Sequence, residues 1–276
     1  MNLNILISTI DERINQVPSV LLPQQSGVSY IVVHQFTSAE APLIPNELQR
    51  PDVNVSQIRG KGVTFARNRS LQLADGDIAL FADDDVTYRS EYFDTVREVM
   101  QAHPDLAVAK FKVATPAGDP EYKDYPDTEY DLLKSENTGT IQLAIRPDLV
   151  RKHHIQFDTR FGAGNSRLIG GDEQIFIHDC LAAGLVALYF PRYIVEHPYV
   201  STAKTIGPYD ARRVRVAGGL DARLNGWIAV PKAIAGAVRY CPDILRNGSN
   251  PFSYCGARIS GAFHVLTTKP SNASLS

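Results

Sequence analysis

The chain has 276 residues, of which 44% are hydrophobic and 21% are charged, and its formal net charge is −2. These values are typical of a globular protein with one large domain, or one domain and an appendage, and they allow a sizeable core. The near-neutral charge gives no argument for a nucleic-acid partner, so we predict none.

The first third of the chain predicts strands that alternate with helices. Short apolar runs rich in β-branched residues predict buried strands at Asn4–Ile10, Val28–Gln35 and Val53–Ile58. Apolar residues then recur at helical spacing from Phe65 to Ala74, before a further strand at Asp77–Asp84. This alternation predicts an α/β fold with a mostly parallel sheet flanked by helices.

The middle of the chain is less regular but continues the same fold class. We expect a helix from Ser90 that stops before Pro104, strands at 106–115, 139–145 and 185–191, and helices at 147–153 and 172–184. The polar stretch Pro116–Lys134 and the glycine-rich stretch Phe161–Gly171 predict loops.

The last segment differs in composition from the rest. Residues 203–276 contain ten Lys or Arg and three Asp or Glu, which indicates an anionic partner. Around Trp227 and Ile234, apolar residues alternate with Lys232 and Arg239, which predicts a basic amphipathic helix. Such a helix can lie on an anionic membrane, pack on the core, or join two copies in a homodimer.

The ends and cysteines of the chain bear on its compartment. The N-terminus has no positively charged leader followed by a long apolar stretch, and the three cysteines lack CxxC spacing. We therefore expect a cytoplasmic protein, with peripheral attachment to the inner face of the cell membrane through the 203–276 extension.

Three consecutive aspartates, Asp83, Asp84 and Asp85, follow the strand that begins at Asp77. Ligands of open α/β sheets bind outside the carboxyl ends of strands, and Mg²⁺ sites use carboxylates together with substrate phosphates. Because alternate residues of an extended segment point to the same side, Asp83 and Asp85 can face one ligand. A solvated acidic loop or a helix cap would explain the run equally well.

The wider context of these aspartates resembles the donor-binding half of family 2 glycosyltransferases of the bacterial polysaccharide or O-antigen type. That family has a glycine-rich turn, Ala-Arg-Asn, a helix, Gly-Asp, an apolar strand and Asp-x-Asp. The matching residues, in the stretch GKGVTFARNRSLQLADGDIALFADDDV, are Gly60, Gly62, Ala66, Arg67, Asn68, Gly76, Asp77 and Asp83–Asp85.

The resemblance implies a GT-A fold over residues 1–202, with a donor-nucleotide half at 1–115 and an acceptor half at 116–202. It implies an inverting hexosyltransferase-like enzyme with Mn²⁺ or Mg²⁺ as cofactor. Its partners would be a nucleotide-sugar donor, most often a UDP-sugar, and a glycan or lipid-linked glycan acceptor. The residues it assigns to donor binding are Thr9, Asp11, Arg67, Asp83 and Asp84.

The stretch RFGAGNSRLIGGDEQIF resembles the acceptor side of the same family, where a glycine-rich loop leads to an acidic pair. By position, Glu173 would be the catalytic base and Asp172 would contact the acceptor, although the family has the order Glu-Asp. Both acids could instead stabilise the first turn of a helix. The family also implies metal ligands at Asp83, Asp85 and His197, and a purely structural histidine is the alternative for His197.

Two other functions remain open. A sugar-nucleotide nucleotidyltransferase would share the sheet and the metal, but it usually has a glycine-rich basic loop after the first strand, where this chain has STIDERI. A metal-dependent carbohydrate-binding module without catalysis would need clustered ligands of the EF-hand or lectin type.

Overall fold

The computed structural model describes residues 1–134, 136–199 and 206–271. This part of the chain forms two compact units. The first unit comprises residues 1–157 and 176–199, and the second comprises residues 158–175 and 206–271. The predicted boundary between residues 202 and 203 lies outside the described residues.

The described strands of the first unit form one sheet, in the order β3-β2-β1-β4-β7-β5-β8-β6. The pairs β1–β2, β2–β3, β1–β4 and β5–β8 are parallel, and the short strands β6 and β7 pair antiparallel. The bounds are β1 Leu3–Ile10, β2 Val28–Phe36, β3 Val53–Arg59, β4 Ile78–Asp83, β5 Leu106–Ala114, β6 Tyr130–Asp131, β7 Leu143–Ile145 and β8 Val186–Glu196.

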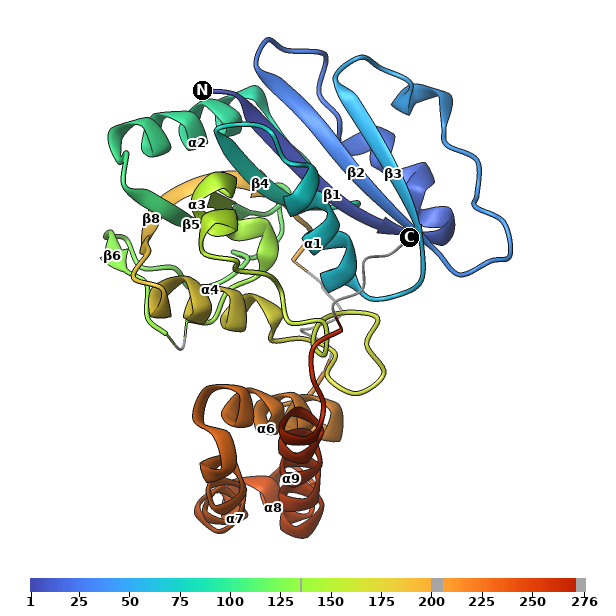
Figure 1. Cartoon of the computed structure of the whole chain (residues 1–276). Helices are drawn as coiled ribbons and strands as arrows, with labels where there is room; N and C mark the ends of the chain where they lie inside the picture. Colours follow the sequence, from blue (N-terminus) through green and yellow to red (C-terminus); the bar gives the residue numbers. More distant parts are fainter. Residues whose placement is uncertain (135, 200–205, 272–276) are drawn as a thin grey trace. The chain divides into compact units, whose positions relative to one another are not determined.

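Helices cover both faces of this sheet, because successive strand residues point to opposite sides. Ile5 and Ile7 pack with the 3₁₀ helix η1 (Asp11–Val20) and with α2 (Ser90–Ala102) on one face. Leu6 packs on the other face with α1 (Val63–Leu73), α3 (Pro147–Lys152) and the body of α4 (Asp172–Ala182). Figure 1 draws α1 and α3 in front of the strands. The predicted mostly parallel α/β sheet flanked by helices is confirmed.

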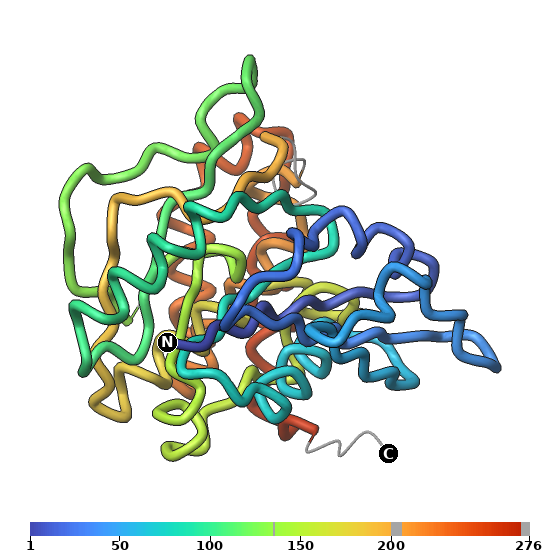
Figure 2. Tube along the Cα trace, turned by 90° about the horizontal axis from the view of Figure 1, so that it is seen from above, coloured from blue at the N-terminus to red at the C-terminus, as the bar shows by residue number. Residues whose placement is uncertain are grey.

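The chain reverses direction within the sheet between β1 and β4. It runs from β1 outward to β2 and β3, and then returns to place β4 on the other side of β1. In Figure 2 the blue strands β1–β3 lie on the right, whereas the green loop after β5 and the gold strand β8 lie on the left. The carboxyl ends of β1 and β4 meet at this point, which is where open α/β sheets bind ligands.

The strand predicted at 139–145 is partly wrong. Residues Thr140–Gln142 form the 3₁₀ helix η3, and only Leu143–Ile145 pair as β7. The amide of Gln142 is buried and donates to the carbonyl oxygen of Phe111 (2.9 Å), so a tertiary contact overrides the strand propensity. The polar stretch after β5 contains only the two-residue β6, in agreement with the predicted loop.

The second unit is helical, as predicted for the C-terminal extension. It contains α6 (Ala211–Asn225), η4 (Gly226–Ile228), α7 (Ala229–Arg239), α8 (Cys241–Arg246) and α9 (Pro251–Thr267). Asp210 and Asn250 cap α6 and α9 by accepting backbone hydrogen bonds of 2.8 Å. None of the described helices is both long and apolar enough to cross a lipid bilayer.

Glycines allow α6 and α9 to approach each other closely. A Cβ atom added at Gly218 would overlap the carbonyl oxygen of Arg258 on α9, and one added at Gly261 would overlap the carbonyl oxygen of Arg215 on α6. The two helices therefore touch backbone to backbone, and each contributes a glycine to the crossing.

Candidate functional site

The carboxyl ends of β1 and β4 are joined by a buried network around Asp84. Only 3% of Asp84 is exposed, and its carboxylate accepts hydrogen bonds from the hydroxyl of Thr9 (2.6 Å) and from Nε of Arg13 (3.0 Å). Arg13 Nη2 also pairs with Asp84 and reaches Asp85 at 3.1 Å. The bond to Asp84 raises the pKa of Arg13, so this guanidinium is permanently charged beside the acidic run.

Asp85 and His197 face each other at the same edge. His197 follows β8, and its Nε2 lies 3.6 Å from Oδ1 of Asp85. The nearby Asp85 carboxylate raises the pKa of His197, and the imidazole in turn lowers the pKa of Asp85. His197 Nδ1 donates to the carbonyl oxygen of Pro198 (2.7 Å), so a neutral ring has its lone pair on Nε2, toward Asp85.

Arg67 approaches the third carboxylate of the run. Its Nη2 lies 3.7 Å from Oδ1 of Asp83, and its guanidinium lies over the ring of Phe157, 5.6 Å from the ring centroid. Arg67 is 6% exposed, whereas about two-fifths of the Asp83 side chain is open to solvent. The three aspartates are thus accompanied by Arg13, Arg67 and His197, which offsets their mutual repulsion.

Several other residues of the resemblance have structural partners. Asn68 of the Ala-Arg-Asn stretch exchanges two hydrogen bonds, of 2.9 and 2.8 Å, with the backbone of Phe157. Gly76 packs against the amide of Asn4, where a Cβ atom would meet Oδ1 at 2.9 Å. These contacts fix α1 and the start of β4, and they thereby position Arg67 and Asp83.

Asp11 lies at the start of η1, in a left-handed conformation with φ of 48°. Its carboxylate accepts from the backbone nitrogen of Thr37 (2.7 Å), and its carbonyl oxygen bonds Nε2 of His34 (2.9 Å). Thr9 and Asp11 therefore stand at the carboxyl end of β1, and both side chains have protein partners. Their contact with a donor stays a prediction.

Asp172 and Glu173 belong to the second unit and open helix α4. Asp172 is buried, with 2% exposure, and Glu173 is half-buried. Gly171 precedes them with φ of 88°, a conformation that favours glycine. An added Cβ there would press on Leu220 of α6 at 3.1 Å, so this glycine also packs on the helical unit.

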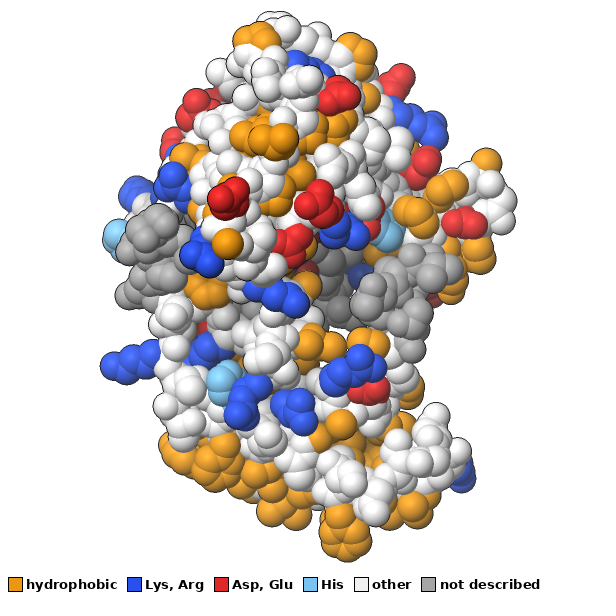
Figure 3. Space-filling model, turned by 90° about the vertical axis from the view of Figure 1, so that its right-hand side faces the viewer, with side chains coloured by type: hydrophobic (Ala, Val, Ile, Leu, Met, Phe, Trp, Pro, Cys, Tyr) orange, Lys and Arg blue, Asp and Glu red, His pale blue; other side chains and the backbone are white. Residues whose placement is uncertain are grey.

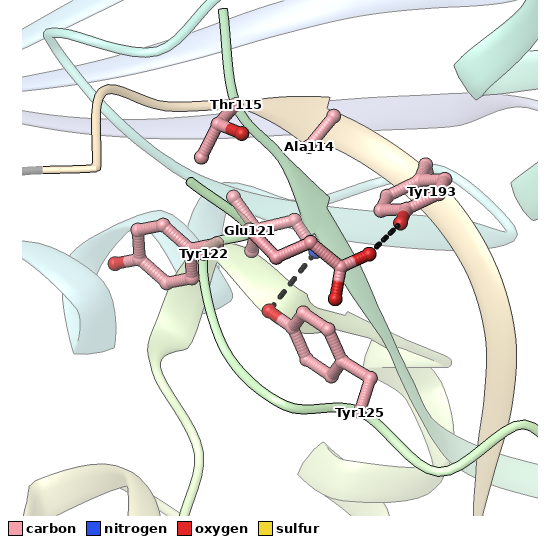
Figure 4. A pocket seen from close by; sticks show the side chains of 7 residues that line it. Ala114, Thr115, Glu121, Tyr122, Tyr125 and Tyr193 are labelled. Atoms are coloured by element: carbon pink, nitrogen blue, oxygen red, sulfur yellow. Dashed lines mark hydrogen bonds between the residues drawn. The ribbon is translucent and has the colours of Figure 1, made fainter. Parts of the chain in front are cut away.

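A small pocket lined by tyrosines lies beside His197 in the first unit. Its volume is 160 Å³, and its walls come from the end of β5, the loop after it and β8 (Figure 4). Tyr122 packs edge-on against the His197 ring at 5.7 Å. Tyr193 donates to Glu121 (3.3 Å) across the pocket, and Tyr125 accepts from the backbone of Val113 (3.1 Å). The lining residues are Val113, Ala114, Thr115, Glu121, Tyr122, Tyr125 and Tyr193.

The described residues contain no group of three His, Cys, Asp or Glu side chains arranged to hold a metal ion. Of the three expected metal ligands, the structure pairs Asp85 with His197 and places Asp83 beside Arg67. A carboxylate and an imidazole whose other nitrogen is fixed by a carbonyl group are donors that suit Mn²⁺ better than Mg²⁺, because Mg²⁺ prefers oxygen ligands.

Sequence reasoning missed Arg13, the cation that bonds both Asp84 and Asp85. The residue stands in the STIDERI stretch after β1, where its charge was visible, but its partners are 71 and 72 residues away. Nothing in the local pattern links the two stretches, although both follow strands whose carboxyl ends a parallel sheet places side by side.

Comparison with solved structures finds 219 chains of similar fold, and structures of S. aureus TarS are among them. The chain superposes on S. aureus TarS with a TM-score of 0.53 and 16% identity, over 83% of this chain and 42% of that structure. A structure of TarS residues 1–349 in complex with UDP gives 0.53 and 17%, and one in complex with UDP-GlcNAc gives 0.52 and 15%. These two overlaps cover 69% and 70% of the fragment. The similarity establishes the fold.

Neither comparison based on sequence adds to this result. No protein-family model matches the chain, and no curated protein matches it.

Proposed function

We propose that this protein is an inverting, metal-dependent glycosyltransferase of the family 2 type with a GT-A fold. It would transfer a sugar from a UDP-sugar to a glycan or lipid-linked glycan acceptor. The observation that carries the proposal is the set of carboxylates and cations at the carboxyl ends of β1 and β4, where the strand order reverses. The fold shared with the glycosyltransferase TarS, which has been crystallised with UDP and UDP-GlcNAc, supports it.

The donor side of the reaction would be formed by the first unit. Asp85 and His197 would hold Mn²⁺ or Mg²⁺. When bound, the ion would act as a Lewis acid and offset the negative charge of the departing diphosphate. Arg67 is held by the Phe157 ring and would keep Asp83 oriented toward the ribose. Thr9 and Arg13 donate hydrogen bonds to Asp84 and keep its side chain buried, which would fix the backbone between Asp83 and Asp85.

The acceptor side needs a base and a surface that recognises sugars. Glu173 would accept the proton as the acceptor hydroxyl attacks the anomeric carbon, while the bond from that carbon to the diphosphate breaks. Asp172 would bind the acceptor. The tyrosine-lined pocket next to His197 offers aromatic faces, a carboxylate and a hydroxyl, a combination that suits one sugar of a glycan.

The proposal is tested by calorimetric titration of UDP with and without MnCl₂, using the whole chain. Asp85→Asn should lower the Mn²⁺-dependent affinity at least about tenfold, or roughly 1.4 kcal/mol. The matched control is Asp94→Asn, which makes the same change on the exposed face of α2 and should leave UDP binding unaltered. Equal affinities for Asp85→Asn and the unmodified chain would refute the metal assignment.

A second measurement separates the proposed enzyme from its two alternatives. Incubation with a panel of UDP-sugars should release UDP in a Mn²⁺-dependent manner, by slow hydrolysis when no acceptor is present. Transfer of labelled pyrophosphate into UTP, with release of the sugar 1-phosphate from the UDP-sugar, would identify a nucleotidyltransferase. Sugar binding without any nucleotide turnover would identify a binding module.

A further inference from the structure

Helix α7 has an unusual distribution of side chains within the second unit. Its buried positions are three small residues spaced four apart, Ala229, Ala233 and Ala237. Its larger apolar residues point outward, with Ile234 53% exposed and Val238 74% exposed. A helix stabilised only by its own core would place these larger side chains inward, because their burial removes more apolar area from water.

Neighbouring segments extend this exposed face. Trp227 and Ile228 of η4 are each 61% exposed, Leu245 of α8 is 58% exposed, and Phe252 at the start of α9 is 87% exposed. Figure 3 shows hydrophobic side chains gathered along the lower end of the view. The name 'apolar surface of the second unit' is used below for six exposed residues: Trp227, Ile228, Ile234, Val238, Leu245 and Phe252. Apolar residues exposed in such a group mark an interaction site.

Positive charge accompanies the apolar surface. Lys232 and Arg239 of α7 and Arg246 of α8 are exposed, and the acid of this stretch, Asp243, pairs with Arg246 at 3.1 Å. In the described part of the second unit there are eleven Lys or Arg and six Asp or Glu. The partner should therefore be apolar where it meets α7 and negatively charged around that contact.

We propose that the apolar surface of the second unit binds the surface of an anionic lipid membrane, with α7 lying in the plane of the interface. Trp227 and the aliphatic side chains would enter the boundary between headgroups and acyl chains, while Lys232 and Arg239 would reach lipid phosphates. A second copy of the chain fits less well. A two-fold contact through this surface would bring two surfaces with the same excess of positive charge together.

The sequence provides a built-in reporter, because Trp227 is the only tryptophan of the chain. Vesicles of phosphatidylcholine with phosphatidylglycerol, added to the full chain, should shift its fluorescence to shorter wavelength as the indole leaves water. Co-flotation measures the partition of the protein between water and the vesicles. Pure phosphatidylcholine vesicles and high salt should both weaken it.

Three variants separate the contributions. Ile234→Ser with Val238→Ser should lower partition at least about tenfold. Lys232→Gln with Arg239→Gln should lower it about 30-fold on anionic vesicles and abolish most of the salt dependence. Leu43→Ser is the matched control, since Leu43 is 92% exposed in the first unit and its replacement should change nothing.

Circular dichroism of each variant checks that the helices remain folded. The inference is overturned if the unmodified chain does not float with anionic vesicles and these vesicles do not change its tryptophan fluorescence. It is also overturned if light scattering shows a dimer that Ile234→Ser with Val238→Ser converts to a monomer without any vesicle binding. Because neither readout uses nucleotide or acceptor, failure here leaves the proposed transferase activity untouched, and the converse also holds.

Discussion

The three consecutive aspartates illustrate how neighbouring identical residues acquire different environments. Asp83 ends β4, and in the turn that follows Thr9 and Arg13 hold Asp84 inward, with a 4% exposed side chain, whereas about 41% of the Asp83 and 45% of the Asp85 side chains are open. Each carboxylate has its own cation, from Arg13, Arg67 or His197. The prediction that Asp83 and Asp85 share the accessible side agrees with these exposures, although β4 ends at Asp83 and the turn after it orients the other two. The identity of their cationic partners depends on long-range contacts that the local sequence does not encode.

The first prediction concerns Glu173 as the proposed base. Glu173→Gln keeps the size and hydrogen-bonding capacity of the side chain but cannot accept a proton. We expect turnover to fall about 10²- to 10⁴-fold, with donor affinity nearly unchanged, as measured by UDP release in the presence of an acceptor and by UDP titration.

The matched variant is Asp172→Asn. Asp172 is 2% exposed, so its replacement should also lower stability, and thermal unfolding must accompany the kinetics. A raised acceptor KM with preserved kcat is the expected result. Loss of kcat in Asp172→Asn, together with near-normal turnover of Glu173→Gln, would reverse the two roles.

At the scale of elements, apolar runs and apolar periodicity predict β1–β5, β8 and helices α1–α4, because these segments bury their side chains on the two faces of the sheet. The failures have tertiary causes. Residues 140–142 become 3₁₀ because Gln142 bonds the backbone of Phe111, and β8 runs to Glu196 because it pairs with β5 as far as Ala114. The extension contains the apolar run Tyr193–Val195, but Pro191 separates it from the predicted strand, and proline ordinarily ends a strand pattern.

The second prediction concerns the crossing of α6 and α9. Alanine within a helix is ordinarily more stable than glycine by about 1 kcal/mol. At Gly261, however, a methyl group would overlap the carbonyl oxygen of Arg215, so the helices must separate. We expect Gly261→Ala to lower the free energy of unfolding by about 1–3 kcal/mol, measured by urea denaturation followed by circular dichroism.

The control is on the same helix. Gly256 is exposed, and an added Cβ would have nothing within 4 Å, so Gly256→Ala should raise stability by about 0.5–1 kcal/mol. Opposite signs for the same substitution, five residues apart, are the expected outcome. Stabilisation by both variants would show that α6 and α9 do not touch through Gly261.

The third prediction concerns Asp158, which ties the 158–171 segment to the ends of α6 and α9. It accepts hydrogen bonds from Arg160 Nε (2.9 Å) and Arg223 Nε (3.2 Å), while Arg160 Nη1 donates to the carbonyl oxygen of Thr268 (2.7 Å). Burial alone would raise the pKa of Asp158, but the hydrogen bonds from Arg160 outweigh it, and the pKa is lowered. The folded state therefore favours the charged form.

The sign of the pH dependence follows from this. Ionised Asp158 should stabilise the folded state fully at pH values above 3.8, the pKa of this residue in the unfolded chain. This contribution should disappear as the pH falls through the lower pKa that Asp158 has in the folded protein. Asp158→Asn should cost about 3–5 kcal/mol at neutral pH, because two arginines lose a buried partner, and the cost should shrink in acid. Asp243→Asn, at an exposed pair, should cost under about 1 kcal/mol at any pH.

At the scale of the whole molecule, composition predicted a difference between the ends of the chain, and the described structure separates an α/β unit from a helical one. Composition could not predict that residues 158–175 belong with the C-terminal helices. That assignment depends on Phe161, Leu168 and Ile175 packing with Ala222 and Ala262, contacts that span up to about 100 residues of sequence.

The last prediction uses this division. Each unit has hydrophobic clusters of its own, so calorimetry should resolve two unfolding transitions. UDP with MnCl₂ at about 100 times its Kd should stabilise the transition of the first unit by about 2.7 kcal/mol, because a ligand stabilises only the state that binds it. Gly261→Ala should lower the other transition and leave UDP affinity unchanged. A single transition that both perturbations move would contradict this prediction, because the two units would then unfold together.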